Sequence, residues 1–125
     1  MNEIRTAKPG VAAADQVVVC LCAAWCDTCD EYRGAFESVA QQFAQALFVW
    51  LDIEDQEELL GPIEVENFPT VLIAAGDEVR FFGTITPQPE TLARLVRASF
   101  AADAAVADVD HAVSGLLRRL RAAAA

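Results

Sequence analysis

The chain has 125 residues, a length that suits one domain with a core large enough to need no stabilising crosslinks. Nine basic residues against nineteen acidic ones give a net charge of −10, which makes nucleic acid and anionic membranes poor partners. The longest apolar run, residues 17–25, is far shorter than the roughly 20 residues of a transmembrane helix. We therefore expect a single globular domain over residues 1–125 without membrane or nucleic-acid partners.

The N-terminal segment is weakly patterned and has room for a short strand or a single helical turn. It lacks the apolar core of a signal peptide, so the expected compartment is the cytoplasm, where thiols stay reduced. All four cysteines cluster between positions 20 and 29. Such a cluster favours catalytic or metal-binding use over a framework of disulfides.

The first half of the chain predicts two buried strands separated by a helix. Residues 17–24 are almost continuously apolar, which is typical of a central strand buried on both faces. Residues 27–46 carry apolar side chains at helical spacing, with acidic residues in the first turn where the helix dipole favours them. A second buried strand is predicted at residues 47–53, followed by one or two helical turns in the acidic segment 54–61.

The second half predicts a hairpin and two helices. A third strand at residues 71–75 and an edge strand at 78–83 flank the turn signal Gly76-Asp77. Helices are predicted at about residues 89–102 and 104–122. The order β-α-β-α-β-β-α, with this further helix at the end, indicates an α/β fold with a mixed sheet and helices packed on its faces.

The last predicted helix carries an apolar stripe that must be buried somewhere. Its residues recur at intervals of three and four, and the stripe comprises Val106, Val109, Val113, Leu116, Leu117 and Leu120. A seam this short is marginal for pairing isolated helices, so we expect it to dock on the chain's own sheet and leave a monomer. A dimer through this helix is the alternative.

The stretch Trp25-Cys26-Asp27-Thr28-Cys29 holds the candidate chemistry. Cys26 falls at a strand-to-helix junction, where the helix N-terminus favours a thiolate and so activates a cysteine as a nucleophile. Cys29 lies one helical turn on and on the same face, within reach of Cys26 for a disulfide. A C-x-x-C at the end of a strand in a small α/β chain predicts a dithiol redox site.

The other two cysteines leave alternatives open. Cys20 and Cys22 alternate on the first strand and so point to one face of the sheet. Small apolar packing is the favoured interpretation. The alternatives are a second dithiol or, together with Cys26 and Cys29, a four-thiolate metal site. The one histidine, His111, is expected to be solvated, and we predict no metal and no cofactor.

These residues resemble the thioredoxin family. Trp25-Cys26-x-x-Cys29 is similar to the family's W-C-x-x-C motif, and Phe68-Pro69-Thr70 is similar to its cis-proline loop. The resemblance covers about residues 16–102 and implies a thioredoxin-like fold, to which the helix at 104–122 is an addition.

The resemblance also implies an activity and roles for individual residues. It implies a thiol–disulfide oxidoreductase that acts on protein disulfides and is served by a reductase. Cys26 would attack the substrate disulfide and Cys29 would resolve the mixed disulfide. Pro69 would be cis and hold the substrate backbone beside the sulfurs. Trp25, Phe68 and Thr70 would complete the substrate contact.

The chain departs from the family pattern at four positions. Three of them, Cys20, Asp27 and Thr28, are expected to modulate the chemistry. A buried aspartate of the family falls on Cys20, and the lysine that pairs with it falls on Trp50. The family's Gly-Pro between the cysteines is Asp27-Thr28 here. Loss of the buried ion pair favours a second hypothesis, a non-catalytic binding or assembly module. Retention of both motif cysteines and of Pro69 favours the enzyme.

Overall fold

The computed structural model describes residues 15–123 apart from residues 24, 56 and 102, so the predictions for the N-terminal segment lie outside it. Its described strands are β1 (Gln16–Cys22), β2 (Ala46–Asp52), β3 (Thr70–Ala75) and β4 (Glu78–Thr84). They form one sheet in the order β2-β1-β3-β4. β1 pairs parallel with β2 and antiparallel with β3, and β3 and β4 form the predicted hairpin.

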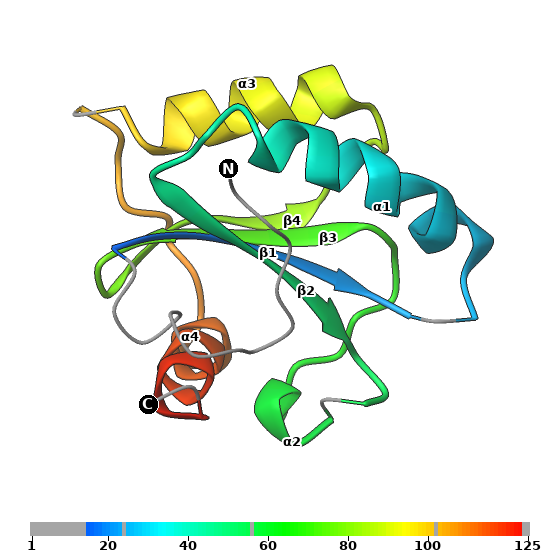
Figure 1. Ribbon diagram of the computed structural model, residues 1–125. Coiled ribbons are helices and arrows are strands. Elements are labelled where there is room, and N and C mark those ends of the chain that lie inside the picture. The colour runs from blue at the N-terminus through cyan, green and yellow to red at the C-terminus, as the bar shows by residue number, and fades with distance from the viewer. Residues whose placement is uncertain (1–14, 24, 56, 102, 124–125) are drawn as a thin grey trace.

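Helices cover both faces of the sheet (Figure 1). α1 (Asp27–Ala40) and α3 (Pro89–Ser99) lie on one face, and α2 (Glu57–Leu60) and α4 (His111–Ala123) lie on the other. The predicted α/β class and element order are confirmed. In the described part of the chain, every helix is too short or too polar to cross a bilayer.

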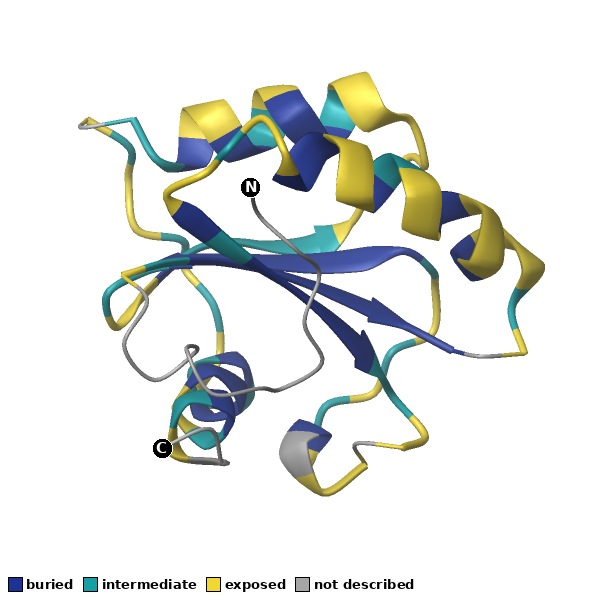
Figure 2. Ribbon diagram, in the orientation of Figure 1, coloured by how far each residue is buried: buried dark blue, intermediate teal, exposed yellow. Residues whose placement is uncertain are grey.

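Strand β1 is the central element that the apolar run predicted, and it is buried from Val17 to its end (Figure 2). Its side chains alternate between the two cores. Those that face α1 and α3 are Val18, Cys20 and Cys22, and those that face α4 are Val17, Val19 and Leu21. The two cysteines before the motif therefore share one face, as predicted, and it is the face that α1 covers.

Helix α1 ends at Ala40, well before the predicted end at residue 46. After it, the N–H groups of Gln42 and Phe43 donate to the carbonyls three residues back, so the chain turns instead of continuing as a helix. The Phe43 ring then stacks on Phe48 of β2, with centroids 6.3 Å apart. The apolar side chain that extended the helical pattern thus packs on the core from a turn. α3 likewise ends at Ser99 and not at residue 102.

The prediction for the start of the last helix was wrong: α4 begins at residue 111, not 104. Upstream of α4, the chain runs beside β4, where the N–H of Ala107 donates to the Val79 carbonyl at 2.8 Å. Asp110 then starts the helix, because its Oδ1 accepts a bond from the N–H of Val113 at 3.2 Å. Val106 is 53% exposed and does not belong to the buried stripe.

The predicted docking of this helix on the chain's own sheet is confirmed. Its apolar side chains are buried in the core beneath β1 and β3, and they are Val113, Leu116, Leu117 and Leu120. Two arginines tie the helix to loops of the core. Arg119 donates to the Leu60 carbonyl at 2.8 Å, and Arg121 donates to the Gly76 carbonyl at 2.7 Å.

Candidate functional site

The candidate site lies where β1 ends and α1 begins. Cys26 occupies the N-cap position of α1 with an extended backbone, and its carbonyl accepts the N–H of Asp30 at 3.2 Å. Its side chain is partly exposed, whereas Cys29, one turn further along the helix, is 1% exposed. Asp27 and Thr28 between them face solvent. The structure thus places the two motif cysteines as predicted, with Cys26 outside and Cys29 beneath it.

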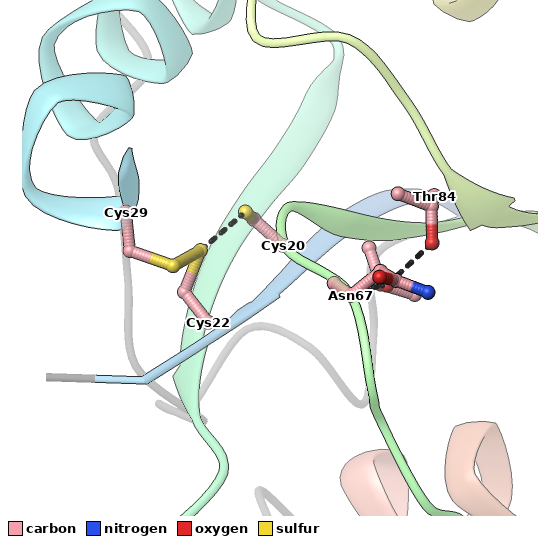
Figure 3. Close-up of a disulfide and its surroundings, with 6 residues drawn as sticks. Cys20, Cys22, Cys29, Asn67 and Thr84 are labelled. Carbon is pink, nitrogen blue, oxygen red and sulfur yellow. Dashed lines mark hydrogen bonds between the residues drawn. A yellow bond between two sulfur atoms is a disulfide. The ribbon is translucent and has the colours of Figure 1, made fainter. Parts of the chain in front are cut away.

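The disulfide in this structure joins Cys22 to Cys29 (Figure 3). Cys26 is a free thiol. The predicted Cys26–Cys29 pairing is therefore not the one observed. Cys22 is the last residue of β1 on the face that α1 covers, and Cys29 points inward from the first turn of α1. Their Cα atoms are 5.8 Å apart, within the usual span of a disulfide.

Cys20 extends this group of sulfurs into the core. Its Sγ lies 3.7 Å from Cys22 Sγ, and the side chain is fully buried. Burial raises the pKa of the Cys20 thiol more than the charge of Arg33 lowers it, so the thiol stays neutral. Burial also raises the pKa of the Tyr32 phenol, with Cys20 as the smaller cause.

The favoured interpretation of Cys22 as simple packing was wrong, because its sulfur is bonded to Cys29. The sequence held a usable signal. Cys22 faces the side of the sheet that a following helix must cover, and Cys29 lies in the first turn of that helix. In the part of the chain that the structure describes, no group of three or more His, Cys, Asp or Glu side chains is arranged to hold a metal ion.

The position of the family's buried aspartate has a different environment here. Cys20 pairs in register with Trp50 of β2. The guanidinium carbon of Arg33 lies 5.0 Å from the centroid of the Trp50 ring, and its Nε lies 3.9 Å from a Glu37 carboxylate oxygen. The Arg33 guanidinium therefore lies near Cys20, although Trp50 occupies the position of the family's lysine, and this arginine was not predicted from the sequence. Spacing along the chain gave no signal for this contact, because it joins α1 to β2.

We expect Cys20→Asp to lower the free energy of unfolding by about 3 kcal/mol at neutral pH, because it buries a carboxyl group that Arg33 offsets only in part. Burial raises the folded-state pKa of such a carboxyl above its unfolded value of about 3.9. The loss should therefore grow as the pH rises above about 4. Thermal unfolding at pH 5 and pH 8 measures it. A loss that is equal at both pH values would mean that the carboxylate stays charged and solvated.

An aromatic pair and the proline loop flank Cys26. Trp25 is 66% exposed, and its ring meets Phe68 edge-on with centroids 5.6 Å apart. The peptide bond between Phe68 and Pro69 is cis. Thr70 is buried, and its hydroxyl donates to the Asn67 carbonyl at 2.6 Å. Thr70 therefore shapes the loop from inside the fold, while Trp25 and Phe68 present the outer surface.

Thr70 also ties the loop to β4. Its Oγ1 lies 3.3 Å from Thr84 Oγ1 (Figure 3), and the Pro69 carbonyl accepts the N–H of Ile85 at 3.1 Å. These contacts fix the proline loop against the sheet, next to the end of β1. The structure thus places Trp25 against Phe68 of the proline loop, whereas Cys20 and Thr70 are buried in the core and do not reach the surface of the site. The site thus comprises a partly exposed cysteine at a helix N-cap, a second cysteine buried one turn behind it and a cis-proline loop.

Comparison with known proteins identifies the family. A family model described as thioredoxin matches residues 7–98, so the chain belongs to the thioredoxin family. Thioredoxin H2-2 from Oryza sativa subsp. japonica is 38% identical over 64 residues, which cover 50% of this chain and 48% of the relative. Human thioredoxin is 32% identical over 60 residues, covering 47% of this chain and 57% of the relative. The chain thus spans about half the length of the curated relatives it matches.

Solved structures agree on the fold. Thioredoxin F from spinach chloroplast superimposes with a TM-score of 0.66 at 20% identity, over 78% of this chain and 94% of that one. A mutant thioredoxin from Halobacterium salinarum NRC-1 gives a TM-score of 0.65 at 20% identity, over 78% and 90%. The thioredoxin-like fold is therefore confirmed, and α4 is an extension beyond the matched family region.

Proposed function

We propose that the protein is a thiol–disulfide oxidoreductase that reduces disulfides of other proteins. The observation that carries this proposal is the exposure of the four cysteines: Cys26 alone is partly exposed, at the N-terminus of α1, with Cys29 buried one turn behind it. A substrate disulfide can therefore reach the Cys26 sulfur, whereas the other three sulfurs are enclosed in the core. Membership of the thioredoxin family supports the same activity.

The exchange proceeds in two steps. The Cys26 thiolate attacks one sulfur of the substrate disulfide, and the other substrate sulfur leaves as a thiolate and is protonated. The Cys29 thiolate then attacks Cys26 Sγ and releases the second substrate thiol. The substrate gains two electrons, and the protein is left with one disulfide. A reductase then returns the protein to the dithiol form. The cytoplasmic location expected from the sequence stays a prediction.

The surface beside Cys26 supports a protein substrate. Trp25 and Phe68 present adjoining aromatic rings, an apolar contact of the kind that protein interfaces favour. The loop at Pro69 is fixed next to it by the hydrogen bonds between Thr70 and Thr84 of β4 and from Ile85, just after β4, to the Pro69 carbonyl. We propose that an extended substrate segment lies across the aromatic pair, of which Phe68 belongs to this loop, with its disulfide beside Cys26.

Reduction of insulin tests the proposal. With dithiothreitol as the electron source, the protein should accelerate insulin precipitation well above the rate with dithiothreitol alone. The alternative is a non-catalytic binding module, which the replacement of the family's buried ion pair favours. It predicts no acceleration, together with retained binding to a partner through the aromatic pair.

Reactivity of the individual thiols provides a second test. In the fully reduced, folded protein, Cys26 should react with iodoacetamide at least about tenfold faster than Cys20, Cys22 or Cys29, because it is exposed and lies at a helix N-terminus. Mass spectrometry of peptides from a timed quench measures the four rates. Faster labelling of Cys20 or Cys22 would overturn the assignment of the nucleophile.

A further inference from the structure

We infer that Cys22 is a third redox-active cysteine, and that Cys29 exchanges its disulfide between Cys26 at the surface and Cys22 in the core. The inference rests on the proposed function, in which Cys26 and Cys29 carry the exchange. It adds a second oxidised form of the same site. In that form, the site has lost two electrons in forming the Cys22–Cys29 disulfide bond, but Cys26 remains a free thiol.

The geometry of the sulfurs supports a shared partner. Cys29 stands between the other two, since it follows Cys26 by one turn of α1 and is bonded to Cys22 at the end of β1. The Cα atoms of Cys22 and Cys29 are 5.8 Å apart. Residues three apart at the start of a helix lie on the same face. Cys29 can therefore pair with either neighbour without moving a strand of the sheet.

Burial makes Cys26 the entry point for electrons. Cys22 and Cys29 are 0% and 1% exposed, so an external thiol has no access to either sulfur of their disulfide. Cys26 is partly exposed and adjoins Cys29. The buried disulfide must then be opened from within the chain, or after local unfolding. Cys20 does not take part in this exchange, because its buried thiol stays protonated and lies on the far side of Cys22 from Cys29.

The exchange step is balanced within the protein. The Cys26 thiolate attacks Cys29 Sγ, the Cys22–Cys29 bond breaks and a Cys26–Cys29 bond forms. Cys22 leaves as a thiolate and takes up a proton in place of the one that Cys26 lost. No electrons enter or leave, and the protein stays oxidised by two electrons. An external reductant then meets the Cys26–Cys29 disulfide at the exposed sulfur of Cys26.

The buried form changes what the surface site can do. While Cys29 is bonded to Cys22, Cys26 acts as a single thiol, and a mixed disulfide formed on it has no resolving thiol beside it. Such an adduct lasts until the Cys22–Cys29 disulfide is reduced or an external thiol releases it. Cys22 would thus set how long Cys26 retains a partner.

Disulfide mapping of the wild-type protein tests the pairing. The reduced protein is oxidised in a glutathione buffer, quenched in acid, alkylated with N-ethylmaleimide and digested without reduction. We expect both linkages, with the Cys22–Cys29 peptide accompanied by alkylated Cys26. Cys20→Ala, a matched change on the same strand face, should keep both linkages, whereas Cys22→Ala should give Cys26–Cys29 alone. Detection of only Cys26–Cys29 in the wild type would overturn the inference.

The rate of reduction separates an exchanging disulfide from a structural one. In a Cys26→Ala variant, dithiothreitol should reduce the Cys22–Cys29 disulfide about tenfold or more slowly than in the wild type, because the internal attacking thiol is gone. Equal rates would overturn the inference. Both measurements are independent of insulin reduction. If the protein reduces insulin but only the Cys26–Cys29 linkage is found, the inference is refuted and the proposed function stands. If both linkages are found but insulin is not reduced, the proposed function is refuted and the pairing stands.

Discussion

Replacing Cys26 with serine should abolish catalysed insulin reduction, with a fall of more than about a thousandfold, the scale on which loss of a covalent nucleophile acts. The serine hydroxyl stays protonated at neutral pH and forms no mixed disulfide. No other cysteine can substitute, because Cys20, Cys22 and Cys29 are all buried. The coupled assay with insulin and dithiothreitol measures the loss.

A matched control keeps this result specific. His111→Ala removes an exposed side chain at the start of α4, far from Cys26 in the chain, and should retain the wild-type rate. Cys26→Ser should also unfold at nearly the wild-type temperature, since Cys26 is only partly buried and makes no disulfide in this structure. Substantial activity in a folded Cys26→Ser variant would remove Cys26 from its assigned role.

The second large effect concerns the added helix. Leu116→Ala should lower the free energy of unfolding by about 3 kcal/mol, because the side chain is fully buried between α4 and the sheet and leaves a cavity. The melting temperature should fall by roughly 10 °C for a domain of this size. Val106→Ala is the matched control, because Val106 is 53% exposed and its truncation should cost less than about 0.5 kcal/mol.

Sedimentation extends this prediction to the oligomeric state. Since the stripe of α4 is covered by the chain's own sheet, the intact protein should sediment as a monomer. Truncation after Asp103 removes the helix and should expose apolar sheet surface and destabilise the protein. A stable dimer that the truncation converts into a well-folded, active monomer would contradict the docking seen here.

Much of the fold could be predicted because local pattern and burial agree. The continuous apolar run of β1 marks a strand buried on both faces, and Gly76, with a φ of 60°, forms the turn that its sequence signal predicts. The helix ends could not be predicted, because tertiary contacts decide them. In the sequence, Phe43 and Val106 both continue helical patterns. In the structure, Phe43 lies after the end of α1 and stacks on β2, and Val106 lies before the start of α4.

For the candidate site as well, local features could be predicted and contacts between elements could not. Spacing placed Cys26 and Cys29 on one turn of a helix, and family resemblance supplied the loop at Pro69. The partner of Cys29 was not predicted, because the pairing depends on how α1 crosses the end of β1. Arg33 was missed for a similar reason, since its position over Trp50 joins residues on different elements. Contacts between elements are where sequence spacing carries least information.

Trapping the mixed disulfide on Cys26 tests directly whether Cys26 is the nucleophile. A Cys29→Ala variant lacks the resolving thiol, so attack by Cys26 on a disulfide-containing peptide should stop at a covalent mixed disulfide. We expect one peptide attached through Cys26, identified by mass spectrometry of a non-reduced digest and released by dithiothreitol. The absence of an adduct from folded protein, or attachment through Cys20 or Cys22, would contradict it.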